Sequence, residues 1–258
     1  MPRRPRQHDH DASGEPALLA GKAALREQVW TALIEASVTR FPGARGRIPN
    51  FTGAEAAARR LAGTDEWGAA RTIKANPDSP QWPVRQRALE DGKTVYMAVP
   101  RLAGPRPFFL LDPHDLADPP RQAASIKGAS RSARTVDLDD LEPVDLVVTG
   151  CVAVGDDGAR LGKGGGFSDL EFAVASAAGL IGPDTVIATT VHDRQVVGAG
   201  VIPTTDHDVW VDLIVTPSGV IRPPSRSRRA GSVRWDELSD EKLESIPFLA
   251  AMRPRPAP

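Results

Sequence analysis

A nearly continuous apolar run over residues 144–154 is the feature that most constrains the fold of this chain. A strand with one face in water alternates apolar and polar residues, whereas an unbroken apolar run is typical of a strand buried on both faces. We therefore predict a central strand here, covered by helices on each side. Further apolar patterns predict strands at 71–75, 93–99, 108–111, 185–190, 196–201 and 209–215, and helices at 17–40, 53–61, 81–90, 168–180 and 235–252.

This alternation predicts an α/β fold, with a mostly parallel sheet and helices on both faces. The strands between 196 and 215 are close enough in sequence to pair antiparallel, and Thr52 is the expected N-cap of the helix that follows it. Residues 113–142 are expected to form a polar connection. We expect a disordered tail over residues 1–16, one α/β domain over 17–252 and a short C-terminal tail over 253–258.

The bulk composition argues against several classes of function. The net charge of the 258 residues is −1, so no overall field favours nucleic acid or an anionic membrane. A single cysteine, Cys151, allows no internal disulfide and is expected to be a small buried residue. No stretch approaches the ~20 apolar residues of a membrane span. We expect a cytoplasmic monomer or homodimer that acts on a small molecule and binds neither nucleic acid nor a membrane.

The segment Arg160-Leu-Gly-Lys-Gly-Gly-Gly-Phe-Ser-Asp169 follows the central strand and leads into a helix. Its glycines lack Cβ atoms, so successive backbone N–H groups can converge on an anion, and the helix N-terminus adds positive potential. Arg160 and Lys163 supply full charges, and Asp169 is placed to hold Mg²⁺ on the same phosphates. The pattern matches neither the P-loop nor the dinucleotide-binding motif. We interpret it as a nucleotide phosphate site, with a simple turn or a mobile lid as the alternative.

Other polar residues follow the ends of predicted strands. Asp206, His207 and Asp208 lie in one turn, from which they can ligate Mg²⁺, orient a substrate or form a surface turn. Asp78 follows the first strand and either caps the next helix or takes part in catalysis. Two further candidates to line the same crevice are His192 and Gln195.

Together these clusters resemble the motifs of the 5-formyltetrahydrofolate cyclo-ligases, also called methenyltetrahydrofolate synthetases. Residues 145–169 resemble the ATP signature of that family, residues 203–216 resemble its second conserved stretch, and Lys22-Ala-Ala-Leu-Arg26 resembles its N-terminal K-x-x-L-R. The segments I-K-A-N-P-D-S-P-Q (73–81) and V-P-R-L (99–102) look like the divergent branch called methenyltetrahydrofolate synthetase domain-containing proteins. The resemblance covers roughly residues 20 to 220. It implies the fold shared with the sugar-phosphate isomerase and CoA-transferase group.

The resemblance also implies a site that uses ATP and Mg²⁺. Its catalytic residues are Lys22, Arg160 and Lys163, its metal ligands are Asp169 and Asp208, and its substrate-binding residues are Asn76, Asp78, Phe167 and Ser168. The implied ATP-binding residues are Lys22, Arg26, Arg160, Leu161, Gly162, Lys163, Gly164, Gly165, Gly166, Phe167 and Ser168. Two departures concern the substrate half of the site. Phe167 and Ser168 replace paired tyrosines, and the stretch from Asp78 to Trp82 replaces one that supplies a glutamate to the pterin.

The implied reaction is the ATP-dependent closure of 5-formyltetrahydrofolate, a reduced folate, to 5,10-methenyltetrahydrofolate, with ADP and phosphate as the other products. Such a reaction needs positioning and charge neutralisation rather than a side-chain nucleophile. Two alternatives stay open. One is an ATP-dependent enzyme that activates a non-folate substrate, and the other is a non-catalytic regulator that binds a nucleotide or a folate.

Overall fold

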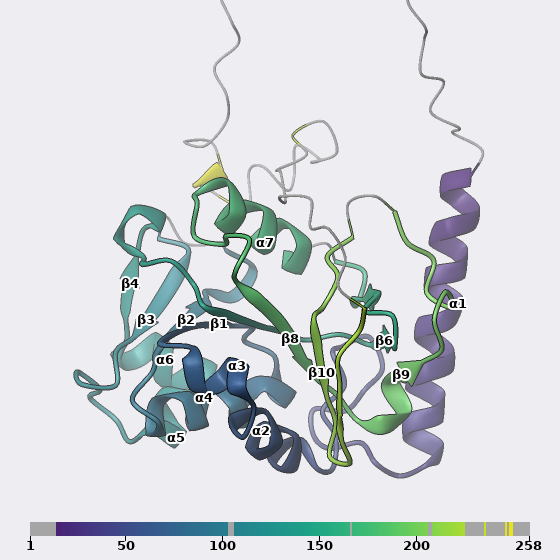
Figure 1. The fold of residues 1–258 in the computed structure, drawn as a ribbon, viewed down its shortest axis with the longest axis horizontal. Helices are drawn as coiled ribbons and strands as arrows, with labels where there is room; N and C mark the ends of the chain where they lie inside the picture. The colour runs from purple at the N-terminus through teal and green to yellow at the C-terminus, as the bar shows by residue number, and fades with distance from the viewer. Residues whose placement is uncertain are drawn as a thin grey trace, which may run out of the picture.

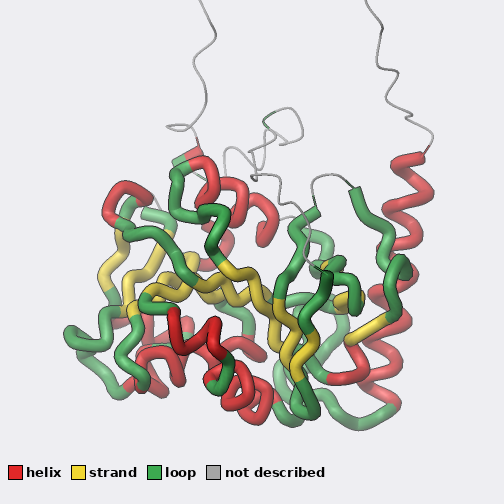
Figure 2. Tube along the Cα trace, viewed as in Figure 1, coloured by secondary structure: helices red, strands yellow, loops and turns green. Residues whose placement is uncertain are grey.

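The computed structural model describes residues 14–102, 106–165, 167–205, 208–224, 235, 246, 248 and 249. An eight-stranded sheet of order β11-β10-β8-β5-β1-β2-β3-β4 crosses the molecule (Figures 1 and 2). Its five inner strands run parallel: β10 (Leu213–Val215), β8 (Val186–Thr190), β5 (Leu146–Thr149), β1 (Thr72–Ala75) and β2 (Thr94–Ala98). The strands toward the edges add antiparallel: β11 (Val220–Ile221), β3 (Phe108–Leu111) and β4 (Arg134–Val136). The predicted α/β class with a mostly parallel sheet is confirmed.

Helices cover both faces of this sheet (Figure 1). One face carries α2 (Ala54–Ala62), α3 (Asp65–Ala69), α4 (Trp82–Glu90), α5 (Pro120–Ala123) and α6 (Ile126–Ser132), and the other carries α7 (Phe167–Ala177). Leu146 and Val148 of β5 pack into the core on the first face, and Val147 packs with Phe172 of α7 on the second. Because both faces of β5 are covered, its sequence shows no polar alternation.

A second, three-stranded sheet packs against the long helix α1 (Gly14–Glu35) and has the order β7-β6-β9. Its strands are β7 (Arg160–Leu161), β6 (Ala153–Gly155) and β9 (Val196–Val197). The apolar run over 144–154 is therefore not one strand. It is divided at residues 150–152 between β5 of the large sheet and β6 of the small one.

Three predictions of local structure are wrong. Residues 113–142 contain α5, α6, β4 and the 3₁₀ turn η3 (Leu138–Asp140), because small buried residues replace the long apolar side chains that usually reveal a helix. A Cβ atom on Gly128 would lie 1.9 Å from the carbonyl oxygen of Gln122, which shows how closely the two helices pack. The N-cap of α2 is Gly53, with φ of 99°, and not Thr52. The strands at 196–215 do not pair antiparallel, since β9 runs parallel to β6 and β10 runs parallel to β8.

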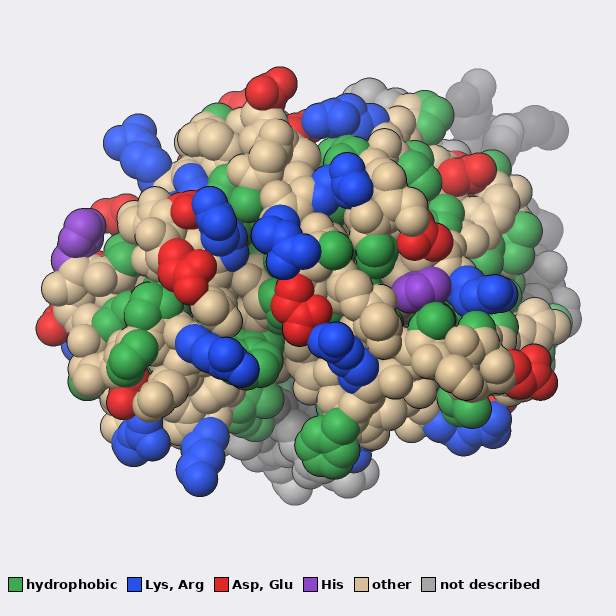
Figure 3. Space-filling model, turned by 90° about the horizontal axis from the view of Figure 1, so that it is seen from below, with side chains coloured by type: hydrophobic (Ala, Val, Ile, Leu, Met, Phe, Trp, Pro, Cys, Tyr) green, Lys and Arg blue, Asp and Glu red, His purple; other side chains and the backbone are tan. Residues whose placement is uncertain are grey.

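The remaining short elements are the 3₁₀ turns η1 (Ser79–Gln81), η2 (Pro100–Leu102) and η4 (Asp193–Gln195). Residues 1–13 and most of the predicted helix at 235–252 lie outside the described residues, although Ile246 and Leu249 are fully buried against α7 residues Leu170 and Val174. None of the described helices is long and apolar enough to cross a membrane. Seen from below, the molecule shows basic and acidic side chains interspersed (Figure 3).

Candidate functional site

The candidate site lies where the parallel strands β1 and β5 end side by side. From β1 the chain continues to β2 on one side, and β5 lies on the other, so this is the point at which the strand order reverses. Open α/β sheets bind ligands in the crevice at such a point. Asn76 follows β1, and its backbone N–H donates to the carbonyl of Val148 at 3.0 Å. Gly150 follows β5 at the same edge.

The glycine loop, residues 162–165, joins β7 to α7 and is held by helix α1. The Nε atom of Arg26 donates to the carbonyl of Gly162 at 2.7 Å. Gly164 has φ of +99°, and a Cβ atom there would lie 3.4 Å from the guanidinium carbon of Arg26, so the loop needs glycine at this position. Lys22 lies one helical turn before Arg26 and on the same face of α1.

Lys22, which is predicted to bind phosphate, contacts Asp208, which is predicted to bind the metal ion. The Lys22 ammonium donates to both carboxylate oxygens of Asp208, at 2.9 and 2.8 Å. The side chains are 12% and 17% exposed. Asp208 also accepts from the backbone N–H of Thr205 at 2.6 Å, so the 205–208 turn presents the carboxylate to α1.

Asp78, in the turn after β1, lies near the glycine loop. Its carboxylate lies 4.0 Å from the ammonium of Lys163. Burial raises the pKa of Asp78, and the charges of Lys163, Arg85 and Arg160 oppose that rise. Asp78 is the N-cap of η1 but makes no side-chain cap hydrogen bond, so the capping interpretation is wrong. The carboxylate instead lies among cations at the strand ends.

Arg85 of α4 fixes the turn that carries Asn76 and Asp78. Arg85 is 1% exposed, and its guanidinium donates to the backbone carbonyls of Asn76, Asp78 (3.2 Å) and Ala124, the C-cap of α5 (2.8 Å). Burial lowers the pKa of Arg85 to about 10, which leaves it charged at neutral pH. Arg85 is not among the residues that the sequence motifs predicted. Its spacing of four from Gln81 and from Leu89, both buried, is the signal that places it on the inner face of the helix.

Arg160 and Leu161 form β7, the strand that directly precedes the glycine loop. Arg160 is 5% exposed and donates from Nη1 to the carbonyl of Gly150 at 3.2 Å, so it connects β7 to the end of β5. The Leu161 side chain packs with Leu25 and Val29 of α1, and its carbonyl accepts from the N–H of Val152 at 2.7 Å. These contacts tie the strand before the loop to its neighbours, and the roles of Arg160 and Leu161 at the nucleotide stay predictions.

Helix α7 begins at Phe167, so the backbone of Phe167, Ser168 and Asp169 forms its first turn. Their side chains, and Gly166, lie outside what the structure describes, as do Asp206 and His207. The described residues contain no group of three or more His, Cys, Asp or Glu that would hold a metal ion. Two carboxylates are nevertheless enough for Mg²⁺, because this ion is usually held by one or two carboxylates together with substrate phosphates and water. Asp169 and Asp208 as its ligands stay a prediction.

His192 and Gln195 have structural roles. Gln195 is 1% exposed and donates to the carbonyls of Cys151 and Val152, at 3.0 and 3.1 Å, in the turn between the two sheets. His192 caps η4, its Nδ1 accepting from the N–H of Arg194 at 3.1 Å. Cys151 is buried, as predicted, and burial raises its pKa to about 11.

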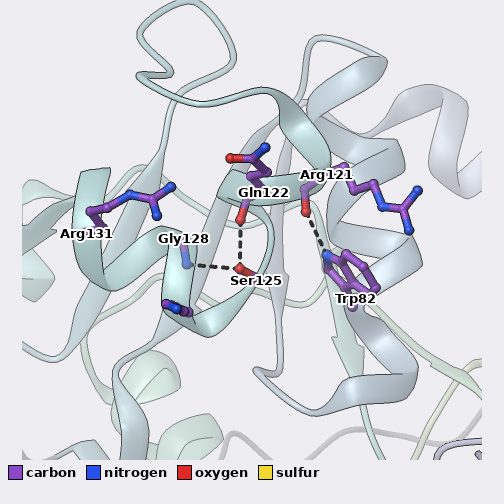
Figure 4. Close-up of a pocket in the computed structure, with 7 residues that line it drawn as sticks. Trp82, Arg121, Gln122, Ser125, Gly128 and Arg131 are labelled. Atoms are coloured by element: carbon purple, nitrogen blue, oxygen red, sulfur yellow. Dashed lines mark hydrogen bonds between the residues drawn. The ribbon is translucent and has the colours of Figure 1, made fainter. Parts of the chain in front are cut away.

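A separate surface hollow of about 470 Å³ lies between α4, α5 and α6, on the face opposite α7 (Figure 4). Trp82 and Arg131 lie on opposite sides of it in this view, and Arg131 is paired with Asp118 at 2.6 Å. The indole N–H of Trp82 donates to the carbonyl of Arg121 at 3.0 Å. None of the predicted site residues lines this hollow.

Comparisons with known proteins show the family and the fold of the chain. A model of the 5-formyltetrahydrofolate cyclo-ligase family matches residues 19–217. Methenyltetrahydrofolate synthase domain-containing proteins of Bos taurus and Mus musculus are 37% and 38% identical over 93% and 91% of this chain, which spans 63% of the length of each. The NMR structure of Aquifex aeolicus 5,10-methenyltetrahydrofolate synthetase aligns with a TM-score of 0.51 at 18% identity, over 84% of this chain and 99% of that one. This last likeness shows the fold.

Proposed function

The chain belongs to the 5-formyltetrahydrofolate cyclo-ligase family, and from this premise we propose that it is an ATP-dependent cyclo-ligase that converts 5-formyltetrahydrofolate to 5,10-methenyltetrahydrofolate. One observation carries the proposal: cations from three separate segments surround the glycine loop at the ends of β1 and β5. They are Lys22 and Arg26 on α1, Arg160 on β7 and Lys163 in the loop itself. Two carboxylates, Asp208 and Asp78, each lie beside one of these cations, Lys22 and Lys163.

The loop and the N-terminus of α7 offer backbone N–H groups to the phosphates, and Lys22, Arg26 and Lys163 neutralise the charge that moves during phosphoryl transfer. The formamide oxygen attacks the γ-phosphate, ADP leaves, and an imidate-like phosphate ester remains on the substrate. The N10 amine then attacks the activated carbon, N10 gives up its proton to the departing phosphate or to water, and phosphate leaves as the ring closes. Mg²⁺, when bound, supplies further neutralisation of the phosphates, with Asp169 and Asp208 as the proposed ligands.

The substrate half of the proposed site is the turn after β1. Arg85 holds this turn, and the Asp78 carboxylate that it presents lies 4.0 Å from Lys163. A substrate bound at Asn76 and Asp78 therefore has its reacting end beside the cations of the loop. Positioning of this kind supplies much of the rate enhancement in two-substrate reactions.

The second candidate function is the same phosphoryl activation on a non-folate substrate. Phe167 and Ser168 favour it, because they stand where the cyclo-ligases have paired tyrosines. The relatives are also longer than this chain, which spans 63% of their length. A non-catalytic regulator that binds a nucleotide or a folate is the third candidate.

The experiment is to mix purified protein with 5-formyltetrahydrofolate, Mg²⁺ and ATP and to follow the absorbance of methenyltetrahydrofolate. We expect a rise that requires ATP, that is lost in Lys163→Met and that persists in Lys127→Met, a matched lysine at the separate hollow. Ser168→Tyr should raise folate turnover. A flat trace from folded protein that binds and consumes ATP would favour the non-folate substrate. ATP binding without ATP consumption would favour the regulator. If the protein did not bind ATP, every candidate function that uses a nucleotide would be refuted.

A further inference from the structure

A buried ion pair joins the central strand β1 to helix α7. The ammonium of Lys74 lies 2.5 Å from a carboxylate oxygen of Glu171, and the side chains are 3% and 6% exposed. Lys74 is flanked in the sheet by Tyr96 on β2 and Val147 on β5. Both neighbours belong to an apolar core that also contains Phe172 of α7. Two full charges therefore lie within an otherwise apolar contact between helix and sheet.

Stability does not explain such a pair. Removing two charges from water is costly, and apolar residues of similar volume in the same place are often as stabilising or more so. What an ion pair adds is a single favoured alignment. The hydrophobic effect is non-directional, whereas a carboxylate and an ammonium in a low-dielectric core favour one relative position.

The two residues lie at positions where alignment affects the candidate site. Glu171 is in the second turn of α7, the helix into which the glycine loop leads. Lys74 is the next-to-last residue of β1, directly before the turn that carries Asn76 and Asp78. Arg26 already holds the first residue of the loop, Gly162, at 2.7 Å. The ion pair holds the helix at the other end of the loop.

We propose that Lys74 and Glu171 are positioning residues that fix α7, and with it the glycine loop, against the strand that presents the substrate turn. The pair thus sets the geometry of the phosphate site without touching the ligand. This inference rests on the proposed function to the extent that the loop binds ATP.

The test is the double variant K74M/E171L, which removes both charges and keeps similar volumes. We expect a midpoint of thermal unfolding equal to or above that of the wild type, together with an ATP affinity lower by about tenfold, the order of the loss seen when residues that orient binding groups are removed. Amide hydrogen exchange in residues 162–165 should become faster. The matched control is Phe172→Leu, which disturbs the same helix without removing charge. It should lower stability and leave ATP affinity unchanged.

The inference would be overturned if the double variant had the ATP affinity and the amide hydrogen exchange of the wild type. It would also be overturned if the double variant failed to fold, because the pair would then act through stability. If the wild type bound no ATP, the proposed function would fail on its own. Hydrogen exchange, which needs no ligand, would still decide the positioning role.

Discussion

The contact between Lys22 and Asp208 predicts that Asp208→Asn has opposite effects on two ATP affinities. The affinity for metal-free ATP should rise, and the affinity for the magnesium complex of ATP should fall. Lys22 is the proposed phosphate ligand, yet in the free protein it is bound to both carboxylate oxygens of Asp208 at 2.8 and 2.9 Å. Metal-free ATP must therefore displace a carboxylate from Lys22. When Mg²⁺ accompanies the nucleotide, Asp208 can bind the metal ion in place of Lys22. The loss of its contact with Lys22 is then compensated by the contact with Mg²⁺.

The size of the effect follows from the burial of the pair. The side chains are 12% and 17% exposed, so solvent screens the interaction only in part. A hydrogen bond between charged groups contributes about 1.5–3 kcal/mol net, and the lower value applies to a partly exposed pair. About 1.4 kcal/mol is tenfold in affinity. Asp208→Asn should therefore bind metal-free ATP about tenfold more tightly than the wild type.

The assay is titration calorimetry with ATP in EDTA and with ATP in excess Mg²⁺. The wild type should prefer the magnesium complex, and Asp208→Asn should lose most of that preference. Lys22→Met should weaken both forms. Asp118→Asn, which removes a carboxylate from an ion pair with Arg131 far from the loop, should change neither. If Asp208→Asn bound metal-free ATP no more tightly than the wild type, the competition between carboxylate and phosphate for Lys22 would be refuted.

Three further predictions concern buried groups at the strand ends. Because burial raises the pKa of Asp78, this group contributes stability at low pH, and that stability is lost as the pH rises from its unfolded pKa through its folded pKa. Asp78→Asn should therefore unfold at a higher temperature than the wild type at neutral pH, and its unfolding temperature should depend less on pH in that window. A Cβ on Gly150 would lie 2.8 Å from both Gln81 Oε1 and Ile48 Cγ2, so Gly150→Ala should lower the free energy of unfolding by about 1–3 kcal/mol in urea titrations. Burial raises the pKa of Cys151 to about 11, so iodoacetamide should label the unfolded chain and spare the folded one; rapid labelling of native protein would contradict the described packing.

The sequence was sufficient for the parts of the fold and site that depend on local pattern. The apolar run at 144–154 predicted a sheet buried on both faces, and the glycines at 162, 164 and 165 predicted the loop between a strand and a helix. The order of motifs placed Lys22 and Arg26 with that loop, and the structure brings Arg26 to Gly162. Local pattern did not reveal the division of the run between two sheets, because the residues on both sides of 150–152 are equally apolar.

Long-range pairing explains what the sequence could not predict. Lys74 and Glu171 are nearly a hundred positions apart, and each alone is an ordinary charged residue in an apolar segment. Arg85 shows a helical spacing that places it inward, but its acceptors are backbone carbonyls, which carry no sequence signal. Asp208 was assigned to a metal without its contact with Lys22, since only the fold brings the two residues together.

The way in which Arg85 holds the substrate turn has a consequence for how this site can change over evolutionary time. Within the part of the chain that the structure describes, the guanidinium donates only to carbonyl oxygens of the main chain, at residues 76, 77, 78 and 124. Arg85 therefore fixes the backbone of the turn without contacting the side chains at positions 76 and 78. Asn76 is 2% exposed, so a replacement there has to fit a buried space, and one that fits keeps the contacts that hold the backbone. A lineage that keeps its phosphate loop and Arg85 can thus explore new substrates by substitutions at a few positions, and a library randomised at 76 and 78 is the laboratory counterpart of that process.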